Sequence, residues 1–404
     1  MELSKQKRIL FVPDCINGLD SGAQSARATL RYLCSLGHTV AVYTKDALVA
    51  VQDEVKNDAA ALYAVPTAMR WYEFISAPKL RRHFISVVDE FQPNYVFFVG
   101  SIQKPAPLAK AARRRSIKTV YLFYINDFFC QRVYAGLADG PCFRCNSGWQ
   151  MPALAKGCVS LRRMPVWIKG ALVRYTLGRE IRSSHRVLGY GDEQLKTCHR
   201  FGVPKERLAR IGFQFDPREL LTIETRDGGY FALTGQPIVQ KGWHLLSSII
   251  SRLQSTAKFM VSFHDQDTAD RAVEKYGLRQ FVDSGRIEIV TNLSERLRYL
   301  DFIASSRGVV LPSFYPTTGE FVLQESMFLG KPVHVFDVGV HKDVLVDRKN
   351  AMVSTLGDVA DYASKIDEVE ANISLRMSIG EEAKRSALHF YSNEQIELLD
   401  KVFI

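Results

Sequence analysis

The sequence predicts an α/β protein with two doubly wound, Rossmann-like domains that face an interdomain cleft. Short apolar runs of strand length alternate with helical segments along almost the whole chain of 404 residues, which is the pattern of parallel sheets with crossover helices. The alternation breaks at the polar stretch 216–229 and then restarts. A chain of this length exceeds one ordinary core, so two domains of roughly 200 residues are expected. Ligands of such sheets bind at the carboxyl ends of the strands.

The individual elements follow from apolar runs and their spacing. The strands expected in the first half are Arg8–Val12, Val40–Thr44, Tyr95–Gly100, Thr119–Ile125, Arg186–Gly191 and Ala209–Phe213. The helices expected between them include Ala23–Leu36 and Leu80–Phe91. In the second half each strand is followed by a helical segment, and the expected strands are Tyr230–Thr234, Phe259–His264, Ile287–Val290, Val309–Pro312 and Pro332–Phe336.

These elements define the expected domains. The first domain covers 1–215 and carries a cysteine-rich insertion at 128–160. Residues 216–229 form a linker, and 230–388 form the second domain. The last segment, 389–404, is expected to be a polar amphipathic helix. Since no strand follows it, this helix either closes the second domain or packs back on the first.

The composition is that of a globular protein, with 47% hydrophobic and 24% charged residues. The longest apolar runs, such as Val120–Ile125, are much shorter than the roughly 20 residues that a membrane-spanning helix needs. The first eight residues lead into a strand without the apolar segment of a secretion signal. We therefore expect a cytoplasmic protein.

The net charge of +10 is unevenly distributed. Residues 1–215 hold 32 Lys and Arg against 16 Asp and Glu, a net charge of +16, whereas residues 216–404 hold 21 against 27, a net charge of −6. The basic half is expected to face something anionic, such as nucleic acid, an acidic lipid surface or a phosphate-bearing substrate.

Small residues follow the first strand, in the stretch 17–26. There Gly22 and Ala23 would let a phosphate or sugar approach the backbone N–H groups at a helix N-terminus. A plain tight turn explains the same residues. The spacing is not that of a G-x-G-x-x-G fingerprint, which disfavours a nicotinamide cofactor.

A second stretch, 230–243, reads as a strand, a short loop with Gly235 and Gln236, and a helix that opens with Lys241. A lysine in the first turn of a helix opposes the helix dipole, which makes sense when the lysine meets an anion held by the same N-terminus. The alternative is a solvated surface lysine.

A third stretch, 316–333, reads as a loop, a helix and the start of a strand. Either Thr317 or Thr318 can cap the helix, and Gly319 lets a ligand approach the backbone. Glu325 lies farther along the helix, where a carboxylate suits a bidentate hydrogen bond to the vicinal hydroxyls of a ribose. The alternative is an ordinary exposed helix glutamate.

Taken together, these stretches resemble the retaining family 4 glycosyltransferases of GT-B fold (glycosyl transferases group 1), which use nucleotide-sugar donors. The resemblance covers nearly the whole chain and is strongest from 230 to 353. Its motifs are "SLGHTVAVYT", "FQPNYVFFVG", "FGVPKERLARIGFQFDP", "TGQPIVQKG", "LPSFYPTTGEFVLQESMFLGKPV" and "FDVGVHKDVLVDRKNAMV". The resemblance implies a hexosyltransferase that acts on a glycan or lipid-linked glycan acceptor, by analogy in surface polysaccharide biosynthesis.

The resemblance also implies roles for single residues. Lys241 matches the lysine that holds the donor pyrophosphate, and Glu325 matches the glutamate that binds the nucleotide ribose. The loop 318–320 matches the loop whose backbone meets the donor phosphate and sugar. The complete donor-binding set is Gly22, Ala23, Gly235, Gln236, Lys241, Thr317, Thr318, Gly319 and Glu325.

The chain departs from the family pattern at three places. Gln236 replaces a usual arginine, Thr317 replaces a usual glutamate, and Asn126-Asp127 stands where a His-Asp pair is common near the acceptor. Glu320 either replaces the missing sugar-binding carboxylate or merely favours the helix dipole. Sugar recognition and acceptor chemistry are therefore rearranged, or the protein is a catalytically weakened member that binds a nucleotide sugar or a partner enzyme.

The resemblance implies no protein nucleophile, metal or other cofactor for the transfer itself. The diphosphate departs while the acceptor hydroxyl attacks the same face, so catalysis consists largely of stabilising the charge on the leaving group. The expected catalytic residues are Lys241, Glu320 and Asp127.

Four of the seven cysteines lie close together in the sequence. They are Cys130, Cys142, Cys145 and Cys158. Without a secretion signal, clustered thiols more often indicate a metal than disulfides. A structural zinc or iron–sulfur site and four unlinked thiols are the two interpretations.

Residues 161–186 contain seven Arg and Lys but only one acidic residue, with apolar residues between them. This is typical of a basic amphipathic helix at an anionic membrane surface, here the inner face of the plasma membrane. The alternative is a helix that packs its apolar stripe on the sheet and solvates its basic face. Nucleic acid is not expected as a partner, since no recognised binding module is present.

Overall fold

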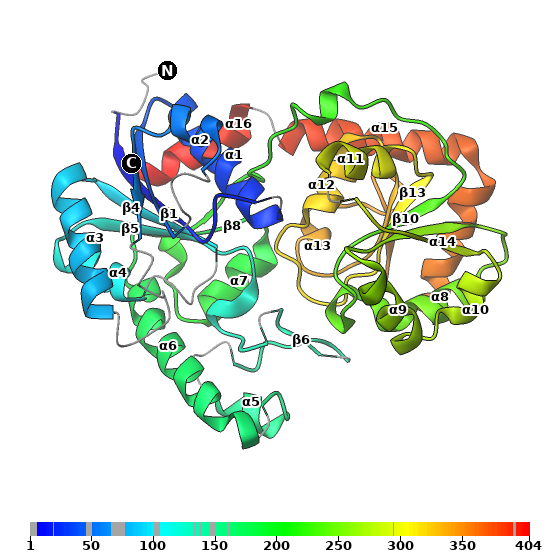
Figure 1. The fold of residues 1–404 in the computed structure, drawn as a ribbon, viewed down its shortest axis with the longest axis horizontal. Helices are drawn as coiled ribbons and strands as arrows, with labels where there is room; N and C mark the ends of the chain where they lie inside the picture. The colour runs from blue at the N-terminus through cyan, green and yellow to red at the C-terminus, as the bar shows by residue number, and fades with distance from the viewer. Residues whose placement is uncertain are drawn as a thin grey trace. The chain divides into compact units, whose positions relative to one another are not determined.

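The computed structural model describes residues 6–18, 20–45, 51–65, 77–100, 106–132, 134–137, 139–145, 150–159, 161–293, 295–390 and 393–404. The chain divides into two compact units (Figure 1). The first contains Met1–Ala135, Phe143–Asp216 and Tyr391–Ile404, and the second contains Gly136–Cys142 and Pro217–Phe390. The first unit thus includes the C-terminal segment Tyr391–Ile404, and the second unit includes the early segment Gly136–Cys142.

The first unit is built on a parallel sheet of seven strands in the order β3-β2-β1-β4-β5-β8-β9. The strands are β1 Arg8–Pro13, β2 Thr39–Thr44, β3 Ala61–Ala64, β4 Tyr95–Val99, β5 Lys118–Leu122, β8 Arg186–Gly189 and β9 Leu208–Arg210. The central strand β4, with the sequence YVFFV, is buried at every residue. Continuous apolar strands of this kind are expected where both faces of a parallel sheet are covered.

The α-helices of the first unit connect and cover these strands. They are α1 Ser21–Ser35, α2 Asp53–Asp58, α3 Ala77–Phe91, α4 Ala106–Arg114, α5 Met151–Ala155, α6 Met164–Arg182, α7 Asp192–Arg200 and α16 Asn393–Asp400. Helix α1 shows why they pack: Ala23, Ala26, Leu30 and Leu33 are all buried, at the spacing that forms one apolar face of a helix.

The C-terminal segment belongs to the first unit, where α16 lies beside α1 (Figure 1). The 3₁₀ turn η8, Lys401–Phe403, follows α16 and buries Phe403 completely. The Phe403 ring packs edge-on against Tyr95 and Phe97 of β4, at centroid distances of 5.2 and 5.7 Å. In addition, His38 Nε2 lies 3.1 Å from Asp400 Oδ1. An aromatic cluster therefore joins the last residues of the chain to the first sheet.

The second unit has a parallel sheet of six strands in the order β12-β11-β10-β13-β14-β15. The strands are β10 Phe231–Leu233, β11 Phe259–Ser262, β12 Ile287–Val290, β13 Gly308–Leu311, β14 Val333–Phe336 and β15 Met352–Ser354. The helices are α8 Leu246–Arg252, α9 Gln266–Lys275, α10 Arg279–Asp283, α11 Arg296–Ala304, α12 Phe321–Phe328, α13 His341–Val344, α14 Val359–Ala371 and α15 Ile373–Phe390.

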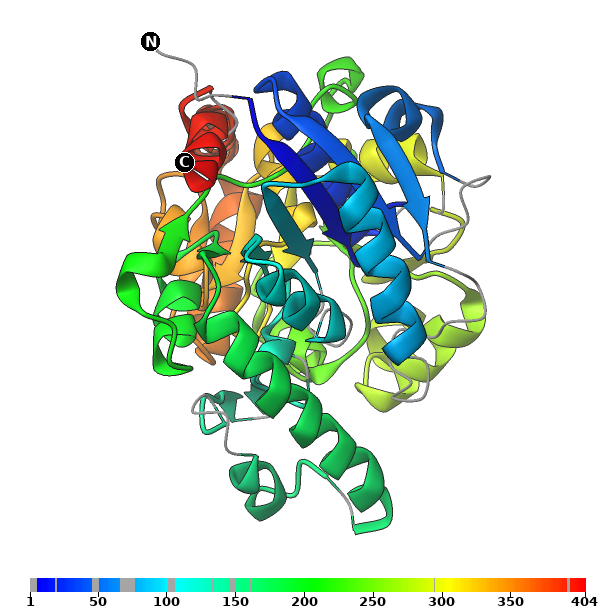
Figure 2. The same ribbon diagram turned by 90° about the vertical axis from the view of Figure 1, so that its left-hand side faces the viewer.

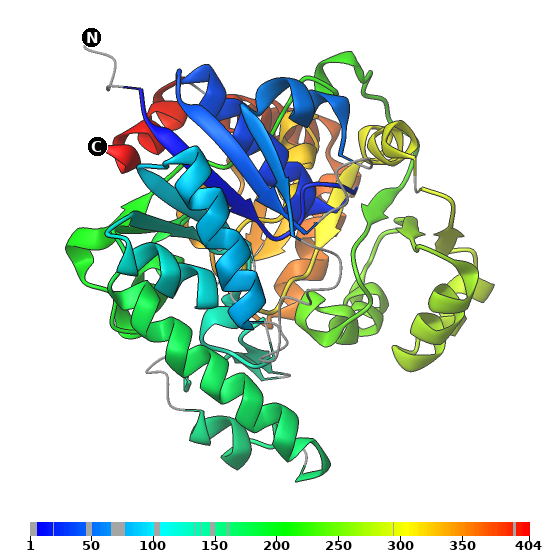
Figure 3. The same ribbon diagram turned by 60° about the vertical axis from the view of Figure 1, so that its left-hand side comes forward.

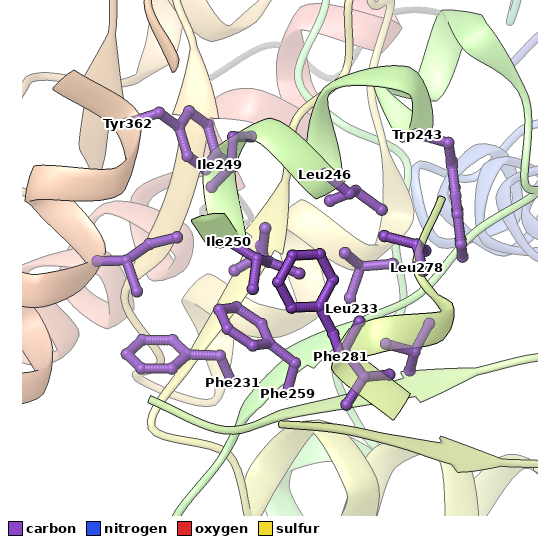
Figure 4. Close-up of a cluster of buried hydrophobic side chains, with 14 of the residues drawn as sticks. Phe231, Leu233, Trp243, Leu246, Ile249, Ile250, Phe259, Leu278, Phe281 and Tyr362 are labelled. Carbon is purple, nitrogen blue, oxygen red and sulfur yellow. The ribbon is translucent and has the colours of Figure 1, made fainter. Parts of the chain in front are cut away.

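The core of the second unit forms between its sheet and the helices on one face (Figure 4). Phe231 and Leu233 of β10 meet Ile250 of α8, and Phe259 of β11 lies in the same cluster. Trp243, in the 3₁₀ turn η7 (Trp243–Leu245), is almost fully buried at its edge. This core fixes the strand order, and with it the loops at the strand ends.

The predicted fold class is confirmed, and each predicted strand overlaps an observed one. In the two large sheets, two strands, β3 and β15, were not predicted. Both lie at sheet edges and have four and three residues. Runs this short give no readable periodicity, so the sequence alone does not mark them.

The insertion at 128–160 is divided between the two units. Its strands β6 Gly136–Leu137 and β7 Gly140–Pro141 pair with each other and belong to the second unit. Within the first unit, α6 runs out beyond the sheet and α5 lies near its far end, as Figures 1, 2 and 3 show from three sides. Among the described residues, no helix is both long and apolar enough to cross a membrane.

Replacing Phe403 by alanine is expected to destabilise the first unit by about 3–5 kcal/mol, because the change leaves a cavity among three aromatic rings. Urea unfolding at neutral pH measures the loss. The matched control is Ile404→Ala, since the Ile404 side chain is 67% exposed and should change stability by less than about 0.5 kcal/mol. Equal stability of Phe403→Ala and wild type would contradict the docking of the C-terminal segment.

Candidate functional site

The polar residues of the second unit gather at the carboxyl ends of three neighbouring strands. Strand β10 pairs with β13, and β13 pairs with β14, all in parallel. The loops that follow these strands, 234–242, 312–320 and 337–341, therefore meet at one edge of the sheet, where parallel sheets bind their ligands.

Lys241 ends a 3₁₀ turn, η6 Val239–Lys241, and is not in the first turn of an α-helix as predicted, because α8 begins only at Leu246. Gly242 follows in the left-handed conformation, with φ of 75°. A Cβ at Gly242 would lie only 1.8 Å from the carbonyl oxygen of Pro312, so only glycine allows this close approach. The tight turn, and not a helix dipole, fixes the position of the lysine.

Glu320 is the centre of a polar cluster in this loop. Its carboxylate forms an ion pair with Lys241, accepts a 2.8 Å hydrogen bond from Ser313 Oγ and lies 3.1 Å from His341 Nε2. The Lys241 side chain is 22% exposed, whereas that of Glu320 is 4% exposed. The Lys241 side chain is therefore partly exposed, while the carboxylate behind it is sealed from solvent.

His341 contacts the second oxygen of the Glu320 carboxylate, Oε2, and is itself fully buried. Its Nδ1 lies 3.0 Å from the carbonyl oxygen of Phe336. Both ring nitrogens therefore lie within hydrogen-bond distance of an oxygen atom, one of the Phe336 carbonyl and one of the Glu320 carboxylate.

The ion pair keeps both Lys241 and Glu320 charged. Burial alone would lower the pKa of Lys241, but the Glu320 carboxylate and Tyr315 outweigh that effect and raise the pKa. Burial alone would likewise raise the pKa of Glu320, but Lys241 and His341 hold it well below its usual value. Tyr315 also accepts a 3.4 Å hydrogen bond from Lys241 Nζ, which lies 5.2 Å from the centroid of its ring.

The predicted cap of α12 is wrong. The N-cap residue is Glu320, with no side-chain capping bond, and neither Thr317 nor Thr318 occupies the cap position. Both threonines are buried, and the Thr317 carbonyl accepts a 3.0 Å hydrogen bond from Val340 N–H. The threonine loop is held against the turn after β14, and Gly319 follows it with φ of 149°.

Glu325 is buried inside α12 with only 1% of its surface exposed, so the alternative of an exposed helix glutamate is wrong. Arg296, at the start of α11, places Nη1 2.5 Å from Glu325 Oε1 and Nε 3.0 Å from Glu219 Oε2. Burial raises the pKa of Glu325, and Arg296 only partly offsets that rise. A ligand at Glu325 would therefore also meet the Arg296 guanidinium.

The loop after β10 leaves its polar residues accessible. Gly235 has φ of 114° and open space around it, and Gln236 is exposed. The Gln236 carbonyl accepts a 2.8 Å hydrogen bond from Ile238 N–H. Neither residue adds a charge to the cluster, which leaves Lys241 as its accessible cation among the described residues of this loop.

In the first unit, the predicted donor-binding residues Gly22 and Ala23 lie beside a carboxylate. Asp20 is the N-cap of α1 and accepts a 3.0 Å hydrogen bond from Ala23 N–H. A Cβ added at Gly22 would lie 3.0 Å from the same carboxylate. An anion approaching Gly22 and Ala23 would therefore meet the charge of Asp20, which the sequence interpretation overlooked.

Asn126 and Asp127 begin the 3₁₀ turn η2, Asn126–Phe128, and both are buried. Burial lowers the pKa of Arg174, and the charge of Asp127 partly offsets this effect. Arg174 is thus a buried partner in this region. It donates 3.1 Å hydrogen bonds to the carbonyl oxygens of Gly170 and Cys130, which corrects its expected place on a solvated basic face of α6.

The four clustered cysteines are all free thiols. In the described part of the chain, no three His, Cys, Asp or Glu side chains are placed to share a metal ion. Cys142 belongs to the second unit, whereas Cys130, Cys145 and Cys158 belong to the first. The structure therefore does not assemble the predicted four-thiolate site.

Sequence reasoning missed four residues of these sites: Ser313, Tyr315, Arg296 and His341. Tyr315 and Ser313 stand in the quoted loop beside Pro316. His341 gives the clearest signal, because it is a histidine placed just after a buried strand and a glycine, in "FDVGVH". Arg296 has no comparable signal, since it stands in a charged helix with other arginines.

Residues 240–386 match the family model described as glycosyl transferases group 1. No curated protein matches the chain. Solved structures match over almost the whole chain, at low identity. One is a sucrose-phosphate synthase from Thermosynechococcus elongatus, with 12% identity, a TM-score of 0.66 and 98% of both chains covered.

Two further similar structures are a glycosyltransferase from Rickettsia africae and HepE from Anabaena in complex with UDP-glucose. The first has 13% identity and a TM-score of 0.67, and covers 98% of this chain and 97% of that one. The second has 14% identity and a TM-score of 0.65, and covers 98% of both chains. At these identities the matches show the fold, which is GT-B with two Rossmann-like domains.

Replacing Glu320 by glutamine is expected to reduce the loss of unfolding free energy that wild type shows as the pH falls. Because Lys241 and His341 hold the pKa of Glu320 below its ordinary value of 4.5, the unfolded chain binds the proton at higher pH than the native one. Stability contributed by this group is thus complete above about pH 4.5 and lost on acidification, by up to about 1.4 kcal/mol per pH unit.

Urea unfolding of wild type and Glu320→Gln between pH 7 and pH 3.5 measures how steeply the free energy of unfolding falls with pH in each protein. Burial also lowers the pKa of His334, to about 3, and this group adds acid sensitivity to both proteins equally. Parallel profiles of the two proteins below pH 4.5 would show that Glu320 does not hold an ion pair in the native state.

Proposed function

We propose that the protein is a retaining glycosyltransferase that transfers a hexose from a nucleotide diphosphate sugar to a glycan or lipid-linked glycan acceptor. The observation that carries this proposal is the cluster of Lys241, Glu320 and His341 at the carboxyl edge of the second sheet. The family match over 240–386 includes all three residues. Similar structures in complex with UDP, with UDP-glucose, or with UDP, fondaparinux and alpha-GlcNAc-glycerol support the same class of ligands.

In this proposal Lys241 stabilises the departing diphosphate. The bond between the anomeric carbon and the phosphate oxygen breaks while the acceptor oxygen bonds to the same face of that carbon. The acceptor proton then passes to the departing phosphate. The negative charge grows on the leaving group, and a preorganised cation lowers the energy of that state. Because Gln236 is neutral, Lys241 supplies the positive charge.

Glu320 acts as a positioning residue, since its carboxylate faces Lys241, Ser313 and His341. A buried carboxylate with these partners has little capacity left for sugar hydroxyls. This role differs from both roles inferred from the sequence. Thr317, Thr318 and Gly319 supply the backbone that faces the donor phosphate and sugar, next to Glu320.

Glu325 and Arg296 bind the nucleoside end of the donor. A carboxylate suits a pair of ribose hydroxyls, and the neighbouring guanidinium holds it in one orientation. In the first unit, Gly22 and Ala23 lie in the loop assigned to the donor, where the Asp20 carboxylate opposes a close approach of phosphate, and Asp127 serves the acceptor. The acceptor belongs to a surface polysaccharide pathway on the cytoplasmic side of the membrane.

A second candidate is a catalytically weakened protein that binds a nucleotide sugar or a partner enzyme. The exposed, neutral Gln236 favours it, because one cation expected on the leaving group is missing. Release of the nucleotide diphosphate from the donor separates the two candidates, since a binding protein retains its ligand without turnover.

Peripheral membrane binding through α6 is part of the proposal. The exposed fractions of Val166 and Tyr175 are 69% and 71%, and Ile168 and Leu172 are about half exposed. The basic residues Arg162, Arg163, Lys169 and Arg179 lie among them and are exposed as well. Exposed apolar side chains interleaved with cations fit an anionic lipid surface.

Lys241→Met is expected to weaken nucleotide diphosphate binding and donor hydrolysis strongly. Thermal-shift screening of UDP-, GDP-, ADP- and dTDP-sugars identifies the donor, because a ligand that binds only the folded state raises its stability. Release of the nucleotide diphosphate is then measured by chromatography. We expect at least about a hundredfold loss of activity, the effect of removing one preorganised group that stabilises the leaving charge.

The matched control is Lys275→Met, an exposed lysine of the same unit, which should retain both properties. Binding without any turnover by wild type would favour the weakened protein. Turnover that persists in Lys241→Met would contradict the assigned site.

Serine substitution at Val166, Leu172 and Tyr175 is expected to reduce flotation with vesicles of phosphatidylglycerol and phosphatidylcholine at least threefold. The control replaces Leu297, Val346 and Met377, three exposed apolar residues of the second unit, and should float like wild type. If both variants float equally, α6 is not the lipid contact.

A further inference from the structure

A small hairpin of the cysteine-rich insertion is built into the second unit. Strands β6 and β7 pair in antiparallel fashion, with Gly136 opposite Pro141 and Leu137 opposite Gly140. These residues belong to the second unit although their sequence neighbours on both sides belong to the first. The chain therefore enters the second unit here, well before the linker at 216–229.

The hairpin sits on the loop that contains Tyr315. A Cβ added at Gly136 would lie 2.9 Å from Tyr315 Cβ and 3.5 Å from Gln240 Cγ. On the other strand, a Cβ at Gly140 would lie 3.7 Å from Leu356 and 3.9 Å from Phe314. Gly140 also has φ of 120°, a conformation that favours glycine. Gly136 thus permits the close contact with Tyr315, whereas Gly140 is favoured by its backbone conformation.

The two residues under Gly136 flank the polar cluster. Tyr315 accepts the 3.4 Å hydrogen bond from Lys241 Nζ and places its ring beside the ammonium group. Gln240 directly precedes Lys241, and its carbonyl accepts a 2.8 Å hydrogen bond from Phe314 N–H. A displacement of Tyr315 or Gln240 would therefore reach Lys241 through one contact.

We infer that the β6–β7 hairpin is a component of the donor-binding unit, and that Gly136 seats Tyr315 and thereby positions the Lys241 ammonium for the diphosphate of a nucleotide ligand. This inference rests on the proposed function of Lys241. Gly136 is a positioning residue, because it acts through Tyr315 and does not contact the reacting atoms.

The test is Gly136→Ala, which adds one carbon atom to the hairpin. The probe is the nucleoside diphosphate that binds wild type most tightly among UDP, GDP, ADP and dTDP, together with the corresponding monophosphate. Isothermal titration calorimetry gives the ratio of the two affinities. Because only the diphosphate carries the phosphate assigned to Lys241, we expect this ratio to fall about tenfold, the effect of about 1.4 kcal/mol.

The matched control is Gly308→Ala, where the added Cβ would lie 2.9 Å from the Pro332 carbonyl oxygen, inside the same unit. It should lower stability without changing the ratio. An unchanged ratio in Gly136→Ala, or an equal fall in Gly308→Ala, would overturn the inference. If Gly136→Ala does not fold, Gly140→Ala strains the backbone of the other strand, because Gly140 has φ of 120°, and should lower the ratio in the same direction. An unchanged ratio there would also overturn the inference.

The Lys241→Met variant distinguishes a failure of the hairpin inference from a failure of the proposed function. If it lowers the ratio and Gly136→Ala does not, the hairpin inference alone fails. If Lys241→Met leaves the ratio unchanged, the proposed function of the cluster fails with it.

Discussion

The ion pair between Lys241 and the buried carboxylate of Glu320 is the interaction on which the rest of the site depends. A buried carboxylate without partners would be costly, but this one has an ammonium group, a serine hydroxyl and an imidazole around it. The same partners fix the direction of Lys241. One buried anion thus fixes a partly exposed lysine at the carboxyl ends of the strands.

The fold supplies these partners from separate parts of the second unit. Ser313 follows β13, His341 follows β14, and Lys241 comes from the turn after β10. Because the three strands are parallel neighbours, their carboxyl ends bring the groups together without long loops. Gly242 completes the arrangement, since any larger residue would collide with Pro312 and move the lysine turn away. The hairpin at Gly136 presses on the same turn from a distant part of the sequence.

The sequence predicted the fold class and the strands well, because alternating apolar runs are a strong signal and most strands are buried on both faces. Lys241, Glu320 and Glu325 stand out in the sequence as site candidates, and in the structure each has an oppositely charged partner. The partners of these groups were not predictable. His341 and Arg296 meet their carboxylates across 21 and 29 sequence positions, and no local pattern records such contacts. Local rules also failed at α12, where Glu320 and not a threonine takes the cap position, because Glu320 bonds to the cluster instead of to the helix.

The central claim is that the Lys241 ammonium, held by Glu320, receives the donor diphosphate. A crystal structure of the protein with its nucleotide diphosphate tests it most directly. We expect a phosphate oxygen within about 3 Å of Lys241 Nζ, with the Glu320 carboxylate still between Lys241 and His341. A diphosphate bound elsewhere, with no phosphate oxygen in reach of Lys241, would contradict the account.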